Sequence, residues 1–294
     1  MAVAIIISAL MLLPCAASAK KKNTPDVSQK SSESQDGELK EIMEQYLKQF
    51  KVPYGAFVAI EPSSGKVLAA VEFTQDKNRK KPLYLDNIFP AASVFKIITS
   101  AALLESGGAN VGTKVCYHGG SQRLMSANIK DNPKKDKSCK SLRDGFAFST
   151  NALFGKLALK HLSQETLKEY AAKFGFNQKP AFELPLKFGT ANIPSDDLSF
   201  ARTAAGFANV TLSPIHGALI AAAIANGGWM PFPVFEGAAE PEKKELLESV
   251  TQETAGKIKA MMVATSVYGT ARKYFKNRSV YLKGIGIATK TGSL

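Results

Sequence analysis

Three short motifs in this sequence contain the side chains that acyl transfer through a serine ester requires. They are Ser93-Val94-Phe95-Lys96, then Ser149-Thr150-Asn151, and finally Lys290-Thr291-Gly292-Ser293. In chain order they supply a nucleophile beside a candidate base, a second hydroxyl with an amide, and a cation next to a glycine. The ordered set is far more specific than any one of its members.

The first motif places Ser93 and Lys96 three residues apart at the start of an apolar segment. If residues 93–105 are helical, both side chains lie on one face of the first turn. A serine alkoxide is inaccessible at neutral pH without a base, and a lysine can act as that base when burial lowers its pKa. The Ser93 backbone amide is a candidate oxyanion donor. The simpler explanation of this motif alone is a serine that caps a helix.

The other two motifs supply groups that would bind substrate and relay a proton. Ser149 offers a second hydroxyl and Asn151 an amide that can hold a carbonyl, although a turn or helix cap would also explain them. Lys290 and Thr291 suit an anionic substrate end, Gly292 permits close backbone approach, and the Ser293 amide is the second candidate oxyanion donor.

The composition is that of a globular, basic protein. The 294 residues are 45% hydrophobic and 21% charged, which suits one large domain or two ordinary ones. A net charge of +13 with a pI of about 9.5 favours anionic partners such as a wall polymer. Its densest lysine cluster, residues 134–140, lacks interleaved aromatics, so we expect no specific nucleic-acid function.

The N-terminal 19 residues are predicted to be a signal peptide. An apolar run over residues 2–13 is followed by Ala17-Ser18-Ala19, and the run is too short to span a bilayer comfortably. The protein is therefore expected in the periplasm or on the outer face of the cytoplasmic membrane. Because no basic residue precedes the run, an uncleaved N-terminus that associates with the membrane stays an alternative. Residues 20–37 have few apolar side chains and are predicted to be a disordered linker.

Cysteine usage agrees with export. One of the three cysteines, Cys15, lies in the predicted signal peptide, which leaves Cys116 and Cys139 as an even pair. A disulfide between them is predicted, with two unrelated thiols as the alternative. Only His118 lies near them, so neither a metal site nor a cofactor is expected.

The pattern of apolar residues predicts an α+β fold with an antiparallel sheet and a large helical region, over residues 38–294. Strands are expected at 55–60 and 66–73, joined by a turn at 62–65, and at 280–290. Helices are expected at 38–50, 93–105, 141–161, 164–174, 214–225 and 252–268.

The three motifs, together with segments 142–148, 213–219 and 223–228, resemble the transpeptidase domain of penicillin-binding proteins over about residues 39–294. The resemblance implies a serine D,D-transpeptidase, or a D,D-carboxypeptidase, that acts on the D-Ala-D-Ala ends of peptidoglycan stem peptides. It also implies acylation by β-lactam antibiotics. By this resemblance Ser93 is the nucleophile and Lys96 its base. Ser149 and Asn151 form the second catalytic motif. Lys290 and Thr291 form the carboxylate clamp, which is the pair that binds the substrate carboxylate.

Some features depart from the family. There the strand with the third motif is followed by further strands and a helix, whereas this sequence stops at Leu294. We therefore expect the C-terminal strands and helix to be missing, the clamp strand to lack a neighbour, and the 294-residue piece itself to be inactive. A serine β-lactamase is the first alternative, although residues 180–200 contain no Glu-x-x-Leu-Asn loop. A non-catalytic penicillin sensor domain is the second.

Overall fold

The computed structural model describes residues 5–11, 32–50, 53–78, 82–120, 123–179, 186–235, 247–275 and 286–293. Strands β2 (Tyr54–Ile60) and β3 (Val67–Thr74) form an antiparallel hairpin. Its turn closes with a hydrogen bond from Gly65 N to Glu61 O, and Gly65 has a φ of 77°, which favours glycine. The predicted hairpin at residues 62–65 is therefore present.

The strand that carries the third motif has a neighbour. Strand β11 (Gly286–Gly292) pairs antiparallel with β1 (Ile5–Met11), in a register that runs from Ile5 opposite Gly292 to Met11 opposite Gly286. The expectation of an unpaired clamp strand is wrong, because the missing backbone partner comes from the opposite end of the chain. Strand β1 lies inside the predicted signal peptide, which stays a prediction.

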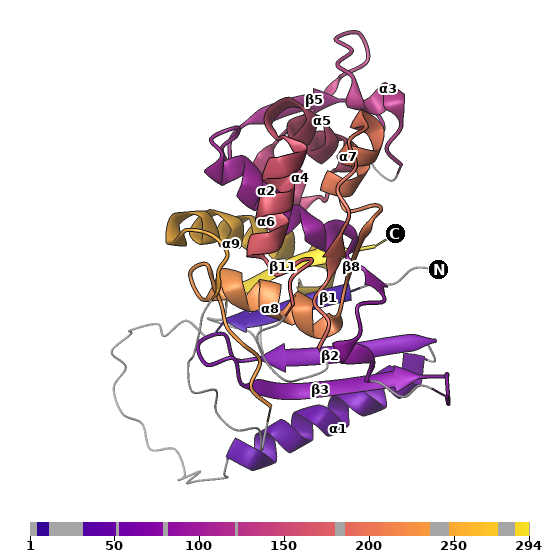
Figure 1. Ribbon diagram of the computed structural model, residues 1–294, viewed down its shortest axis with the longest axis vertical. Coiled ribbons are helices and arrows are strands. Elements are labelled where there is room, and N and C mark those ends of the chain that lie inside the picture. The colour runs from indigo at the N-terminus through magenta and orange to yellow at the C-terminus, as the bar shows by residue number, and fades with distance from the viewer. Residues whose placement is uncertain are drawn as a thin grey trace.

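Helices cover these strands on both sides (Figure 1). Helix α1 (Ser32–Phe50) packs on β3, α8 (Pro214–Ala225) contacts both β1 and β2, and α9 (Gln252–Val267) contacts β11. Helix α1 begins inside the predicted linker 20–37, six residues before the predicted start.

A second, largely helical region lies beyond α8 and α9 (Figure 1). Its helices are α2 (Lys96–Glu105), α3 (Ser126–Ile129), α4 (Leu142–Ala147), α5 (Asn151–His161), α6 (Gln164–Lys173) and α7 (Asp197–Ala204). The remaining elements are η1 (Leu83–Leu85), β4 (Phe89–Pro90), η2 (Ala92–Phe95), β5 (Lys114–Tyr117), β6 (Ser138–Ser141), β7 (Thr190–Ala191), β8 (Val210–Leu212), β9 (Trp229–Met230), β10 (Leu247–Glu248) and α10 (Arg272–Phe275). Among the described residues, no helix is both long and apolar enough to cross a bilayer.

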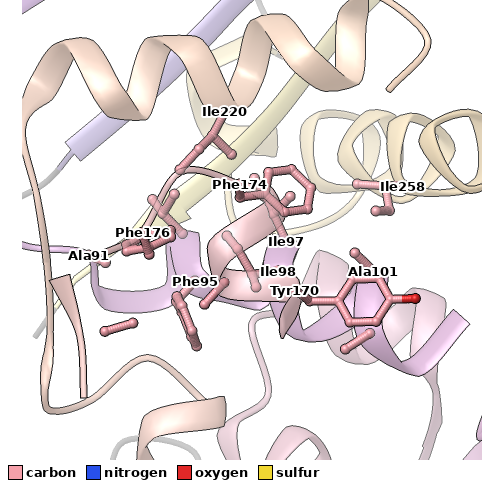
Figure 2. Packing of buried hydrophobic residues seen from close by; sticks show 14 of the residues in the cluster. Ala91, Phe95, Ile97, Ile98, Ala101, Tyr170, Phe174, Phe176, Ile220 and Ile258 are labelled. Atoms are coloured by element: carbon pink, nitrogen blue, oxygen red, sulfur yellow. The ribbon is translucent and has the colours of Figure 1, made fainter. Parts of the chain in front are cut away.

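Helix α2 is enclosed by the main hydrophobic core (Figure 2). Phe95 and Ile98 are fully buried, and the Phe95 ring meets the Phe176 ring edge to face at 5.4 Å between centroids. Phe174 from the end of α6 and Ile258 from α9 belong to the same cluster. A helix packed on all sides has little freedom to shift, so α2 is a rigid support for the side chains of the first motif.

Candidate active site

Ser93 lies in a short 3₁₀ turn, η2, immediately before α2. It is the one partly exposed residue between 91 and 100, since every other residue of that segment is buried. The preceding Ala92 has a φ of 47°, a left-handed conformation that is unusual for a residue with a Cβ. Gly206 holds this turn in place, because a Cβ there would lie 1.9 Å from the Ala92 carbonyl oxygen.

The Lys96 ammonium group is at the centre of the site. Its Nζ lies 2.8 Å from Ser93 Oγ, 2.7 Å from Asn151 Oδ1 and 2.6 Å from the Ala205 carbonyl oxygen. The side chain is fully buried. Burial lowers the pKa of Lys96 well below its usual value, and the nearby positive charge of Lys290 lowers it further. The lowered pKa favours the neutral amine form that a general base requires.

The second motif interrupts a helix that the sequence predicts to be continuous over 141–161. Helix α4 ends at Ala147, Ser149 has a left-handed φ of 55°, and α5 begins at Asn151. The break is stabilised by a hydrogen bond from Thr150 N to Gly145 O. It turns Ser149 toward β11 and places Asn151 at the first position of α5, where its side chain accepts from Lys96.

Lys290 of β11 contacts the second motif. Its Nζ donates to Ser149 Oγ at 3.1 Å and to the Thr291 carbonyl oxygen at 2.8 Å. The side chain is fully buried, and this burial lowers its pKa to about 7. Lys96 is thus hydrogen-bonded to Ser93 and Asn151, and Lys290 is hydrogen-bonded to Ser149, which brings together parts of the chain that are far apart in the sequence.

The end of β11 lies against the turn that carries Ser93. A Cβ at Gly292 would be 3.3 Å from the Ala92 Cβ and 3.4 Å from Val94 Cγ2, so the lack of a side chain permits this approach. Ser293 follows immediately and is exposed. Seven of the eight predicted site residues, all but Ser293, therefore take part in hydrogen bonds or close packing within the site.

Two contributors to the site were missed in the sequence. One is the Ala205 carbonyl, which no side-chain pattern can reveal because it is a backbone group. The other is Thr270, after α9, whose Oγ1 is 2.6 Å from Thr291 Oγ1. A single threonine carries no motif, so its relevance depends entirely on the fold.

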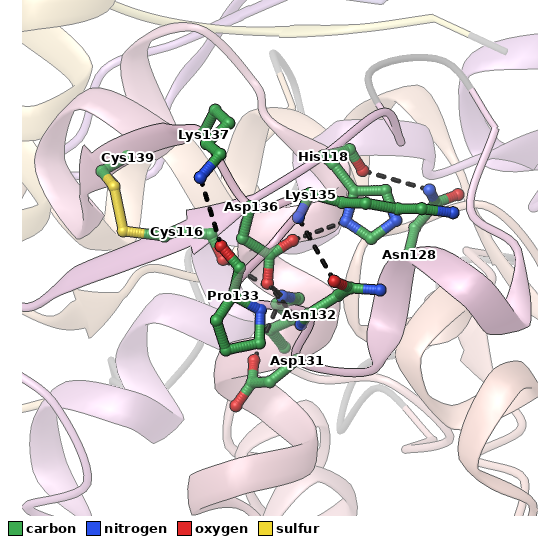
Figure 3. A network of polar contacts seen from close by, with 11 residues as sticks. Cys116, His118, Asn128, Asp131, Asn132, Pro133, Lys135, Asp136, Lys137 and Cys139 are labelled. Atoms are coloured by element: carbon green, nitrogen blue, oxygen red, sulfur yellow. Dashed lines mark hydrogen bonds and ion pairs between the residues drawn. A yellow bond between two sulfur atoms is a disulfide. The ribbon is translucent and has the colours of Figure 1, made fainter.

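A disulfide-bonded hairpin contacts α5, and Figure 3 shows its disulfide and the polar contacts beside it. Cys116 of β5 and Cys139 of β6 form the disulfide. Lys156 of α5 donates to the Cys116 carbonyl at 3.1 Å and to Asp136 Oδ2 at 2.7 Å. Since α5 begins with Asn151, the hairpin is attached to the same helix as the second motif. No cluster of His, Cys, Asp or Glu suited to a metal ion occurs in the described part of the chain.

Comparison with known proteins gives one family and consistent relatives. The family model described as the penicillin-binding protein transpeptidase domain matches residues 55–293. Peptidoglycan D,D-transpeptidase PbpA of Mycobacterium tuberculosis is 27% identical over 273 residues, which cover 81% of this chain and 55% of the relative. The chain thus spans about half the length of the curated relatives it matches.

Solved structures agree with this match. The crystal structure of PBPA from M. tuberculosis has a TM-score of 0.66 at 25% identity, and the match covers 88% of this chain and 65% of that one. Its penicillin G acyl-enzyme complex has a TM-score of 0.65 at 25% identity, covering 89% and 65%. The predicted α+β fold, with an antiparallel sheet and a large helical region, is confirmed.

Proposed function

The chain belongs to the family of penicillin-binding protein transpeptidase domains, and on that premise we propose that it is the catalytic domain of a peptidoglycan D,D-transpeptidase. Its substrates would be stem peptides ending in D-Ala-D-Ala, and β-lactams would acylate the same serine. The observation that carries the proposal is a set of three hydrogen bonds. Lys96 contacts Ser93 and Asn151, and Lys290 donates to Ser149.

Acylation would begin with proton transfer from Ser93 to Lys96. In the neutral amine two N–H groups donate to Asn151 Oδ1 and the Ala205 carbonyl, which leaves the lone pair for the Ser93 hydroxyl 2.8 Å away. As the proton moves to Nζ, Ser93 Oγ bonds to the carbonyl carbon of the penultimate D-alanine. The backbone amides of Ser93 and Ser293 are the proposed donors to the oxyanion.

Collapse of the tetrahedral intermediate would expel the terminal D-alanine. Its amine needs a proton, and the Ser149 hydroxyl is the proposed donor because Lys290 Nζ, at 3.1 Å, can replace the proton that Ser149 loses. An acceptor amine from a second strand would then attack the ester and lose its proton along the reverse path. Water as the acceptor would give the carboxypeptidase reaction instead.

The substrate carboxylate would lie near Lys290 and Thr291. An anion beside buried Lys290 would stabilise its ammonium form, so substrate binding and the charge on this lysine favour each other. β-Lactams carry an equivalent carboxylate, which accounts for their proposed competition with the peptide.

Export is part of the same proposal, since peptidoglycan is assembled outside the cytoplasm. We expect the exported protein to begin at Lys20, which intact mass spectrometry of the secreted product would show. Such cleavage would remove β1 as well, so β11 would need another backbone neighbour in the mature protein. A product that retains residues 1–19 would contradict the signal-peptide prediction and support membrane association through the N-terminus.

The test of the proposed function is intact mass after incubation with benzylpenicillin, with Ser93→Ala as the control. The sequence-based expectation of an inactive 294-residue piece depended in part on an unpaired clamp strand. Because β1 pairs with β11, we instead propose that the wild-type chain forms a stable adduct and that the variant forms none. If the chain folds cooperatively but forms no adduct, the catalytic proposal is wrong.

The same measurement separates a transpeptidase from a serine β-lactamase, which would hydrolyse penicillin rapidly without an accumulating adduct. A β-lactamase also needs a group that activates water. Asp196 is occupied as the N-cap of α7, where its side chain accepts from Ser199 N at 2.9 Å. This contact argues against Asp196 as that group, whereas Glu183, another acidic residue between 180 and 200, lies outside the described residues.

A further inference from the structure

Thr270 contacts both β11 and the end of α4. Its hydroxyl is 2.6 Å from the Thr291 hydroxyl on β11. Its backbone N–H donates to the Ala147 carbonyl oxygen at 3.0 Å, at the end of α4 and two residues before Ser149. One residue therefore links the strand of the third motif to the segment of the second.

The turn that carries Thr270 is fixed to α4 at further points. A Cβ at Gly269 would lie 2.3 Å from the Ala147 carbonyl oxygen, so this turn and the end of α4 meet backbone to backbone. The Tyr268 hydroxyl donates to Asp144 Oδ1 at 2.9 Å, and its ring packs beside Phe148 with centroids 5.9 Å apart. The position of the Thr270 hydroxyl is thus set by three separate contacts of its own turn.

The pair of hydroxyls determines where the Thr291 proton points. Each threonine hydroxyl has one proton to donate and can also accept. If Thr270 donates to Thr291 Oγ1, the proton of the Thr291 hydroxyl points away from Thr270. Because Thr291 is partly exposed, it can donate this proton to a bound substrate. Without Thr270 the Thr291 hydroxyl could rotate freely.

We propose that Thr270 is a positioning residue that orients the Thr291 hydroxyl toward the carboxylate of the substrate or β-lactam. This inference rests on the proposed function, because it concerns how the same site recognises an anionic substrate end. Thr270 itself would touch neither the substrate nor the reacting atoms.

The chain contains a matched control for this contact. Ser266 Oγ lies 2.9 Å from Thr289 Oγ1, so a second hydroxyl pair joins α9 to β11. Both members are buried, whereas Thr270 and Thr291 are partly exposed. Removal of the Ser266 hydroxyl therefore breaks a similar hydroxyl pair on the same strand, β11, but from α9 and not from the turn that follows it.

The experiment measures the second-order rate constant for acylation by benzylpenicillin in Thr270→Val, Thr291→Val, the double variant and Ser266→Ala. We expect Thr270→Val to lower the rate constant by about tenfold, which corresponds to about 1.4 kcal/mol, because the Thr291 hydroxyl would lose the partner that orients it. Thr270→Ser should restore it, and Ser266→Ala should stay within about twofold of wild type. In the Thr291→Val background the Thr270 substitution should have no further effect.

Two results would overturn the proposal. One is an acylation rate constant that is unchanged in Thr270→Val. The other is a Thr270→Val substitution that lowers the rate constant equally in the wild-type and Thr291→Val backgrounds. Thermal unfolding identifies a variant that fails to fold, and Thr270→Ala then replaces Thr270→Val in the same cycle. Failure of the proposed function is distinguishable, because it would appear in the wild-type chain as the absence of a Ser93-dependent adduct.

Discussion

At the scale of single residues, the pKa values of the two buried lysines are lowered by partly different causes. Lys96 is surrounded by three acceptors and lies near Lys290, whose positive charge adds to the effect of burial on its pKa. For Lys290 burial is the cause, and its pKa falls to about 7. A charged Lys290 therefore helps to keep Lys96 neutral, which links substrate recognition to the proposed general base.

The first prediction follows from these two pKa shifts. The rate constant for acylation should fall at low pH as Lys96 gains a proton, and again above about pH 7 as free Lys290 loses one. Lys290→Arg should remove the alkaline decrease, because arginine stays protonated. The measurement is benzylpenicillin acylation from about pH 5 to about pH 10. Lys187→Arg on the surface is the control, and an alkaline decrease that persists in Lys290→Arg would contradict the assignment.

At the scale of the elements, the close contact between Gly206 and the turn η2 holds Ser93 in position. Gly206 has a φ of 84°, and a Cβ there would lie 1.9 Å from the Ala92 carbonyl oxygen. We expect Gly206→Ala to lower the free energy of unfolding by about 2–4 kcal/mol and to reduce acylation more than about tenfold, since the turn must move.

Gly256 in α9 is the matched control for this second prediction. It is exposed, and a Cβ there would meet no atom within 4 Å. Gly256→Ala should therefore stabilise the helix by about 0.5–1 kcal/mol. Urea unfolding and benzylpenicillin acylation of both variants test the pair. Equal stability changes at the two glycines would show that the contact with Ala92 is unimportant.

The third prediction concerns the disulfide-bonded hairpin on α5. The bond between Cys116 and Cys139 closes a loop with a sequence separation of 23, for which chain entropy predicts about 3 kcal/mol of stabilisation. Replacing both cysteines by serine should lower the urea midpoint accordingly. A Cys15→Ser variant, with and without reductant, controls for the third thiol. Identical unfolding of the oxidised and reduced forms would contradict the prediction.

Some elements could be predicted from the sequence and others could not. Helix α8 has the same bounds as the predicted helix 214–225, and its start is stabilised because Ser213 caps it and Pro214 occupies its first turn. The break between α4 and α5 was missed, since the apolar pattern continues across it and the left-handed Ser149 depends on distant contacts such as Lys290. Pairing of β1 with β11 was missed for the same reason, because the partners lie at opposite ends of the chain.

At the scale of the whole molecule, the candidate site lies where distant parts of the chain meet. The contact between Lys96 and Asn151 spans 55 positions and that between Lys290 and Ser149 spans 141. These groups are assembled only when the strands, α2 and the α4–α5 segment are all in place. Acylation at Ser93 is therefore a sensitive measure of complete folding.

The last prediction concerns the net charge of +13, which belongs to no single element. A surface this basic should attract an anionic wall polymer through long-range electrostatics, and added salt should weaken that attraction. We expect co-sedimentation with isolated anionic wall material to decrease several-fold between about 20 mM and about 500 mM NaCl. Ser93→Ala should bind as well as wild type, because the attraction depends on charge and not on acylation. Binding that is unaffected by salt, or that requires Ser93, would instead indicate recognition within the active-site groove.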